Sequence, residues 1–171
     1  MKGYVQVYTG DGKGKTTASI GLAIRAAGAG LNVFIAQFLK QGDYSEIRAL
    51  SRFSDRITIE QFGLGGFIVG EPSPEDIQAA VNGLNRAKEV MAGGKVDIII
   101  LEEANRAASR GLLPVQALLD MIHQKPDSVE LVITGREADP AVIEAADLVT
   151  EMNCIKHYYQ KGVPARTGIE K

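Results

Sequence analysis

The sequence predicts an α/β fold in which a mostly parallel β-sheet carries helices on both faces. Three observations support this prediction: short apolar runs alternate with longer stretches at helical spacing, a glycine-rich turn joins the first run to the first helix, and two later runs are apolar throughout. Alternating strands and helices favour a parallel sheet, and strands covered on both faces lose polar alternation. We expect residues 1–171 to form one domain, with a tail over residues 156–171 that stays mobile unless something docks on it.

The first third of the chain predicts strand, helix and strand, followed by a loop. "YVQVY" (residues 4–8) is rich in β-branched and aromatic residues and ends in a glycine-rich turn. Over residues 15–29, apolar side chains recur at helical spacing, and two glycines supply a stop. "NVFIAQF" (residues 32–38) is expected to be the second strand, and residues 41–50 are expected to form a loop.

The middle of the chain predicts a third strand and the longest helix. "RITIEQF" (residues 56–62) has the strand pattern, and "GLGGFIVG" (residues 63–70) is expected to be a loop. In "SPEDIQAAVNGLNRAKEVMAGG", Ser73 is a suitable N-cap, Pro74 takes the first helical position, and the glycine pair ends the helix.

The remainder alternates strands with short helices. "VDIIIL" (residues 96–101) and "LVITG" (residues 131–135) are the two continuous apolar runs, typical of strands buried on both faces. "VQALLDMIHQ" (residues 115–124) is an amphipathic helix, "DPAVIEAA" is a helix capped by Asp139, and "LVTEM" (residues 148–152) is a last short strand.

Composition narrows the classes of function. Nineteen basic residues against 21 acidic ones give a net charge of -2, which provides no broad footprint for nucleic acid or an anionic membrane. No apolar run approaches the roughly 20 residues that span a bilayer, and the N-terminus has no signal-peptide stretch. Cys154 is the single cysteine, so no internal disulfide or cysteine zinc cluster can form. We expect a cytoplasmic protein without nucleic-acid or membrane partners.

The turn "TGDGKGKTT" has the parts of a phosphate-binding loop: a strand end, a glycine-rich turn and a helix N-terminus. Its glycines let the backbone approach a phosphate, a lysine can reach phosphate oxygens, and a threonine hydroxyl can ligate Mg²⁺. The residues expected to bind a nucleoside triphosphate are Thr9, Gly10, Asp11, Gly12, Lys13, Gly14, Lys15, Thr16 and Thr17. A glycine turn with incidental lysines is the alternative. With this loop, the predicted fold is P-loop NTPase-like, of the RecA-like type.

The loop is one residue shorter than the usual pattern, in which Gly and four further residues precede Gly-Lys-Ser/Thr. Gly14, Lys15 and Thr16 supply the end of the pattern, but Thr9 stands where the first glycine should be, and Gly10 is one residue too close. A shorter loop should not reproduce the usual wrap around the β-phosphate. We therefore expect the phosphate position or the direction of the nucleotide to differ from the usual arrangement.

Two further strand ends offer residues for a triphosphate site. Glu102 and Glu103 follow the apolar run at residues 96–101, where P-loop proteins carry an acid for Mg²⁺; strand side chains alternate, so one of the pair should face the metal. Arg136 follows the apolar strand of "LVITGRE", and ligands of parallel sheets bind at the carboxyl ends of strands. The alternative for Glu102 and Glu103 is that they are solvated at the strand end or cap the next helix. The alternative for Arg136 is a surface side chain paired with Glu137 or Asp139.

Taken together, several segments resemble the cob(I)alamin adenosyltransferases of the P-loop corrinoid-salvage type. They are "TGDGKGKTTASIGLAIRAAG", "NVFIAQFLK", "DIIILEE", "LVITGRE", "ADLVTEM" and "KHYYQKGVPARTGIE". The resemblance extends over residues 4–170, and both the shortened loop and the tail pattern "KH…G…A…GIE" are marks of the family.

The resemblance implies transfer of the 5′-deoxyadenosyl group of ATP to the cobalt(I) of a reduced corrinoid, with release of triphosphate, in adenosylcobalamin biosynthesis or salvage. It implies that ATP lies reversed and that the loop grips the terminal phosphates while cobalt(I) attacks the ribose C5′, so that no general base is needed. Lys15 and Arg136 are then the catalytic leaving-group clamp, and Thr16 and Glu103 hold Mg²⁺ or Mn²⁺. The resemblance also implies a homodimer and an electron-donor reductase as partner.

Some positions depart from the family pattern. Glu102 stands where the family's acidic pair usually has Asp. Phe67 matches the phenylalanine of a "GF-x-W" motif, whereas Val69 replaces the aromatic residue that helps to pack the corrin. Phe67, Tyr44 and His157 are the expected corrinoid-side residues; ordinary loop packing for the first two and a structural role for the histidine are the alternatives.

Two other function classes stay open on the sequence. A phosphohydrolase or kinase-like enzyme would cleave ATP at the γ-phosphate and release ADP. A non-catalytic nucleotide or corrinoid carrier would bind its ligand without turnover, and the missing aromatic at Val69 favours it. The identity of the phosphate product separates the enzymes, and turnover separates the carrier.

Overall fold

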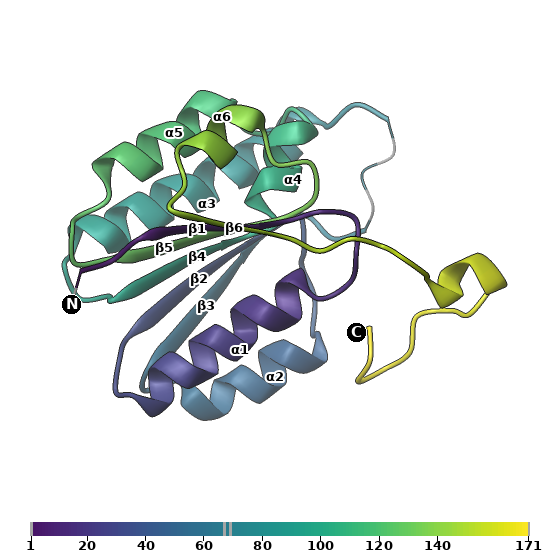
Figure 1. The fold of residues 1–171 in the computed structure, drawn as a ribbon, viewed down its shortest axis with the longest axis horizontal. Coiled ribbons are helices and arrows are strands. Elements are labelled where there is room, and N and C mark those ends of the chain that lie inside the picture. Colours follow the sequence, from purple (N-terminus) through teal and green to yellow (C-terminus); the bar gives the residue numbers. More distant parts are fainter. Residues whose placement is uncertain (1, 67, 69, 171) are drawn as a thin grey trace.

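A computed structural model describes residues 2–66, 68 and 70–170. Its centre is a six-stranded sheet in the order β3-β2-β4-β5-β1-β6, and every neighbouring pair of strands is parallel (Figure 1). The strands are β1 Val5–Thr9, β2 Val33–Phe38, β3 Ile57–Phe62, β4 Ile98–Glu102, β5 Glu130–Thr134 and β6 Leu148–Glu151.

Helices cover both faces of the sheet, as the alternation of strands and helices predicts. In Figure 1, α1 (Lys15–Gly28) and α2 (Ser45–Leu50) lie on one face, and the other four lie on the opposite face. Those four are α3 Pro74–Ala92, α4 Ala104–Ser109, α5 Val115–Gln124 and α6 Pro140–Glu144. Two short 3₁₀ turns, η1 Ser51–Phe53 and η2 Tyr158–Lys161, complete the regular structure of the described residues.

The core has two layers because successive side chains of each strand point to opposite faces. Phe34 and Phe38 of β2 pack into the larger cluster beneath α3, α4 and α5, whereas Ile35 packs with Ala23 and Ala26 of α1 on the other face. All six residues of β2 are buried, as expected of a strand covered on both faces, and Gln37 is the one polar residue among them. The sheet is thereby held rigidly, and the loops at its carboxyl edge carry the polar residues.

The local signals at the helix ends are confirmed. Ser73 accepts a hydrogen bond from the backbone N–H of Asp76 while the Asp76 carboxylate accepts from the Ser73 N–H, which is a complete capping box, and Pro74 begins α3. Asp139 caps α6 by accepting from the N–H of Ala141. Each predicted strand and helix is found, with ends that coincide or differ by at most two residues.

The structure corrects the prediction of a loop over residues 41–50 and adds a helix after β4. Ser45–Leu50 forms α2, and Ala104–Ser109 forms α4. Each has six residues, and α2 buries only Leu50. One or two turns are too short to show a helical repeat of apolar residues, so the sequence pattern could not reveal them.

The last strand, β6, lies at the edge of the sheet, and all four of its residues are exposed. The chain then leaves the body of the molecule and returns toward the carboxyl edge of the sheet (Figure 1). None of the helices in the described part of the chain has the length and apolar character needed to span a bilayer.

Candidate active site

The phosphate loop connects the end of β1 to α1, as the sequence predicts. Its glycines pack against the chain that follows β6: the Gly12 N–H donates to the Met152 carbonyl at 2.6 Å. A Cβ at Gly10 or Gly12 would lie 2.5 or 2.6 Å from that carbonyl oxygen. The loop therefore needs glycine at these positions to fit against residue 152, in addition to any approach by a phosphate.

Lys15 is buried at the base of this loop. Its Nζ donates to the Gly10 carbonyl at 2.5 Å and to the Gly12 carbonyl at 2.7 Å, so the ammonium braces the turn from inside. Burial lowers the pKa of Lys15, and Glu103 opposes that shift. At the start of α1, Gly14 has a φ of 126° and no side chain caps the helix, so the first N–H groups of α1 are available to an anion.

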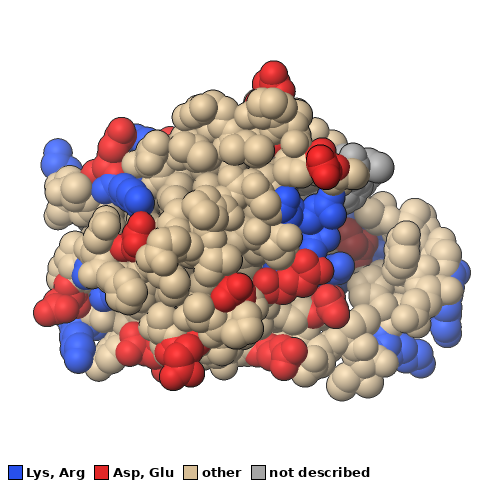
Figure 2. Space-filling model, turned by 90° about the horizontal axis from the view of Figure 1, so that it is seen from above, with Lys and Arg blue, Asp and Glu red and all other residues tan. Residues whose placement is uncertain are grey.

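A cavity of about 450 Å³ opens beside the loop at the carboxyl edge of the sheet. In Figure 2, basic and acidic side chains lie together in the hollow between the main part of the molecule and the lobe on the right, which is formed by the chain that follows β6. The cavity is lined by Gly12, Lys13, Gly14, Lys15, Thr16, Thr17, Ile20, Lys40, Ser45, Glu46, Glu103, Arg136, His157, Gly168, Ile169 and Glu170. Its cations come from three separate strand ends, which suits a polyanionic ligand.

Thr16 is joined to the last residue of β4. Its Oγ1 donates to Oε1 of Glu102 at 2.5 Å, and Lys40 Nζ lies 3.5 Å from the same oxygen. Glu102 is 1% exposed, and burial raises the pKa of its carboxyl against the effect of Lys40. The other oxygen, Oε2, is buried and has no hydrogen-bond partner among the described residues.

Glu103 reaches the cavity by a different route. It has a φ of 63°, in the left-handed region, and its N–H donates to Thr134 Oγ1 at 3.0 Å. The strand ends at Glu102, so the alternation that predicts a single inward-facing acid does not extend to residue 103. Glu102 therefore contacts Thr16 from the strand, while Glu103 lines the cavity from the turn.

Arg136 follows β5 and lines the cavity, near enough to Lys15 for its charge to act on that ammonium group. The alternative in which it pairs with Glu137 is wrong, because Glu137 forms its ion pair with Arg106. Asp139 caps α6. Within the described ranges, with their gaps at 67 and 69, no ion pair engages the Arg136 guanidinium, which leaves its donors for a ligand.

Of the other loop residues expected to bind the nucleotide, some line the cavity and some do not. Thr17 lines the cavity, and Asp11 is exposed. Thr9 ends β1 and turns its hydroxyl away to accept a hydrogen bond from the Ala138 N–H at 3.2 Å. Lys13 lines the cavity and contacts the C-terminal segment.

Of the expected corrinoid-side residues, Phe67 lies outside the described part of the chain, together with Val69. Tyr44 precedes α2, and the Lys40 Nζ lies 6.0 Å from the centre of its ring. His157 lines the cavity, and its Nδ1 accepts from the Tyr159 N–H at 3.0 Å to cap η2.

Comparison with known proteins decides the class of this site. The family described as ATP:corrinoid adenosyltransferase BtuR/CobO/CobP matches residues 1–170. The chain belongs to the ATP:corrinoid adenosyltransferase family. It is an enzyme of the class that the resemblance of its motifs implies.

Two curated relatives of the family illustrate the match. The corrinoid adenosyltransferase of Pseudomonas aeruginosa is 34% identical over 170 residues, which cover 99% of this chain and 84% of the relative. That of Escherichia coli K12 is 31% identical over 176 residues, covering 99% and 86%. Among solved structures, a KaiC-like protein from Pyrococcus horikoshii shares the fold, with a TM-score of 0.59 at 14% identity over 88% of this chain and 72% of that one.

Sequence reasoning missed two residues that line this cavity and one that holds a neighbouring loop. Lys40 directly follows the second predicted strand in "FLK", and the strand-end rule that found Arg136 could have found it. Arg110 binds the carbonyls of Ile68 and Gly70 at 3.2 and 2.7 Å and thereby fastens the glycine-rich loop. Glu170 was part of the tail pattern, but no rule of spacing places it beside the loop.

Proposed function

We propose that this chain transfers the 5′-deoxyadenosyl group of ATP to the cobalt(I) of a reduced corrinoid, with ATP reversed in the cavity beside the phosphate loop. The observation that carries the proposal is the cavity itself: it gathers Lys15, Lys40 and Arg136 around a loop one residue short, in a chain that belongs to this family. The loop then grips the terminal phosphates, and the ribose C5′ points outward.

The reaction balances without a general base. The cobalt(I) of the corrinoid substrate donates an electron pair to C5′ and becomes cobalt(III) with a cobalt–carbon bond. The C5′–O bond breaks, and its electron pair leaves with the intact triphosphate. Because the charge develops on the triphosphate, the side chains that accelerate the reaction are those that stabilise it, with Lys15 and Arg136 as the main donors.

The residues present fit a divalent cation, Mg²⁺ or Mn²⁺. Thr16 and Glu103 both line the cavity and offer the oxygen donors that such a cation prefers. The Thr16 hydroxyl donates its hydrogen bond to Oε1 of Glu102, which leaves the lone pairs of the hydroxyl oxygen free for a metal. We assign Thr16 and Glu103 as ligands and Glu102 as the group that orients Thr16. Mg²⁺ bound there would neutralise part of the triphosphate charge.

The corrinoid is proposed to approach from the side of Tyr44, His157 and the loop that contains Phe67. This side adjoins the cavity through Ser45 and Glu46 at the start of α2. It also includes the exposed Leu64, which is 56% exposed. A flat apolar macrocycle needs such a surface, and a reversed ATP would present C5′ toward it.

The proposal extends to the setting of the reaction. We propose one domain that acts in the cytoplasm as a homodimer, with a separate electron-donor reductase that supplies cobalt(I). One sheet with a core on each face supports the single domain. The exposed edge strand β6, with Leu148 and Val149 partly uncovered, supports a second copy as its partner. Sedimentation of the full chain tests the dimer.

The identity of the phosphate product, triphosphate or ADP with inorganic phosphate, tests the proposed reaction. The protein is mixed anaerobically with Mg-ATP and chemically reduced cobalamin, and the corrin absorbance and the phosphate products are followed. A light-sensitive adenosyl-corrinoid with intact triphosphate is expected. ADP with inorganic phosphate and an unchanged corrinoid would instead mean γ-phosphate chemistry, and binding without turnover would mean a carrier.

A further inference from the structure

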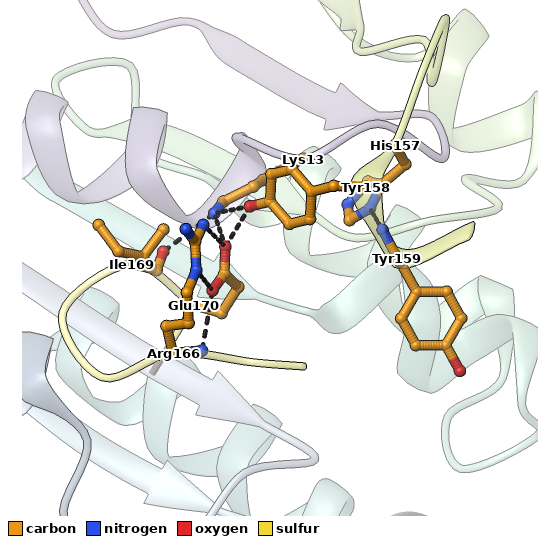
Figure 3. A network of polar contacts seen from close by, with 7 residues as sticks. All are labelled: Lys13, His157, Tyr158, Tyr159, Arg166, Ile169 and Glu170. Atoms are coloured by element: carbon orange, nitrogen blue, oxygen red, sulfur yellow. Dashed lines mark hydrogen bonds and ion pairs between the residues drawn. The ribbon is translucent and has the colours of Figure 1, made fainter. Parts of the chain in front are cut away.

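The C-terminal segment closes one side of the ATP cavity. After β6 the chain runs outward through η2 and returns, so that its last turn lies against the phosphate loop (Figures 1 and 3). Gly168, Ile169 and Glu170 line the cavity together with His157. Beyond β6 this segment has one short 3₁₀ turn as its only regular structure within the described residues, so side-chain contacts must hold it against the loop.

Glu170 is the centre of those contacts. Its carboxylate accepts from Lys13 Nζ at 2.7 Å, from the Tyr158 hydroxyl, and from the backbone N, Nε and Nη2 of Arg166 at 2.9, 3.3 and 3.2 Å (Figure 3). The side chain of Glu170 is 17% exposed. Arg166 first, and then Lys13 and Tyr158, hold the pKa of this carboxyl well below its usual range.

Lys13 uses all of its hydrogen-bond donors in contacts with the C-terminal segment. An ammonium group has three hydrogens, and Lys13 Nζ has three acceptors there: the Tyr158 hydroxyl at 3.1 Å, the Ile169 carbonyl at 3.0 Å and Glu170 at 2.7 Å. While these contacts hold, no hydrogen of Lys13 remains for a phosphate oxygen. Lys15 of the loop and Arg136 after β5 are left as donors to the triphosphate.

We propose that Glu170 and Tyr158 are positioning residues for adenosyl transfer, which fasten the last turn of the chain to Lys13 and so complete the wall of the ATP cavity. The inference rests on the proposed function in placing ATP in this cavity. It changes the expected role of Lys13 from a triphosphate ligand to the anchor of the C-terminal wall.

The first test needs no substrate. Hydrogen exchange of residues 157–170 is measured in the full chain for the parent, Glu170→Gln and Tyr158→Phe. Glu60→Gln is the matched control, because Glu60 pairs with Arg86 in an exposed ion pair and does not line the cavity. Both tail variants should exchange at least about tenfold faster in this segment, and the control should not. Unchanged exchange in Glu170→Gln overturns the proposal.

The second test measures Mg-ATP affinity by calorimetry and the steady-state constants. Glu170→Gln should raise the Kd and the KM for ATP about five- to tenfold and change kcat less than about threefold, because the wall binds ATP and does not touch the reacting atoms. Adding Lys13→Met to Glu170→Gln should raise the Kd for ATP by less than a further factor of about two, since both changes release the same segment.

Three outcomes separate the alternatives. Tighter ATP binding in Glu170→Gln would show that the carboxylate competes with triphosphate, and full additivity of Lys13→Met would show that Lys13 binds phosphate itself; either contradicts the proposal. If the parent binds Mg-ATP but forms no adenosyl-corrinoid, the proposed function fails, while exchange and affinity still decide the role of Glu170.

Discussion

The Thr16 hydroxyl donates a hydrogen bond of 2.5 Å to Oε1 of Glu102, which joins the phosphate loop to the end of the central strand β4. This contact determines which way the lone pairs of Thr16 point. It also means that a metal site at Thr16 depends on a carboxylate that is almost fully buried.

Replacing Thr16 tests this relationship. Thr16→Val leaves Glu102 without its hydroxyl partner and should lower the free energy of unfolding by about 1–3 kcal/mol, the range for a buried acceptor that loses its donor. It should also abolish Mg²⁺-dependent transfer, whereas Thr16→Ser keeps the hydroxyl and both properties. Urea unfolding and adenosyl-corrinoid formation are the measurements. Full activity in the valine variant would contradict the assignment of Thr16.

Glu103 is predicted to be the metal-binding acid. Because its side chain lines the open cavity, Glu103→Gln should leave stability nearly unchanged but raise the Mg²⁺ concentration for half-maximal activity at least about tenfold. Glu144→Gln, an exposed position on α6, is the control. An unaltered Mg²⁺ dependence in Glu103→Gln would leave Glu102 as the acid that contacts the metal.

Arg136 is predicted to act on the leaving group. Arg136→Ala should reduce kcat by about 10²- to 10³-fold, as for other donors aimed at developing charge, with a smaller rise in the Kd for ATP. Arg106→Ala is a matched control, because Arg106 pairs with Glu137 and does not line the cavity. Equal losses in kcat for the two variants would mean that Arg136 only supports the local fold.

The glycines of the loop give a prediction about stability. A Cβ at Gly12 would lie 2.6 Å from the Met152 carbonyl oxygen, whereas a Cβ at Gly21 in α1 would meet nothing within 4 Å. Gly12→Ala should therefore destabilise the fold by about 1–3 kcal/mol, and Gly21→Ala should stabilise it by about 0.5–1 kcal/mol. Urea unfolding of both variants measures the contrast, and a neutral Gly12→Ala would refute the close packing.

The depressed pKa of Glu170 predicts how docking of the C-terminal segment responds to pH. The folded-state pKa lies below the free value of about 4.3, so the ionised carboxylate stabilises docking fully above that pH and loses its effect as the pH falls toward the folded value. The ratio of exchange rates between Glu170→Gln and the parent over residues 157–170 should be flat near neutrality and shrink below about pH 4. A ratio that stays constant down to about pH 3 would contradict the role of the Glu170 carboxylate.

Much of the fold could be predicted because each strand and long helix carries its own signal. β4 and β5 contain the continuous apolar runs of residues 98–101 and 131–133, and α3 has both its N-cap and its terminating glycines. The short helix α2 was missed because a single buried residue, Leu50, gives no repeat.

The site was harder to predict where backbone conformation or distant contacts decide it. The left-handed φ of Glu103 ends the strand alternation one residue earlier than the pattern suggests, so two acids approach the site instead of one. Lys13 and Glu170 stand 157 positions apart, and no local rule pairs residues across that distance. Composition and spacing describe neighbours along the chain, while this contact depends on the whole topology.

The packing of the phosphate loop against residue 152 has a consequence for biosynthesis. β1 pairs only with β5 and β6 among the described strands, so β1, which leaves the ribosome before them, has no neighbour in the sheet until they emerge. An unfinished chain carries every residue of the loop but lacks the surface that shapes it. We expect a nascent chain to acquire ATP affinity only after β6 has emerged, so that no truncated product sequesters nucleotide during translation.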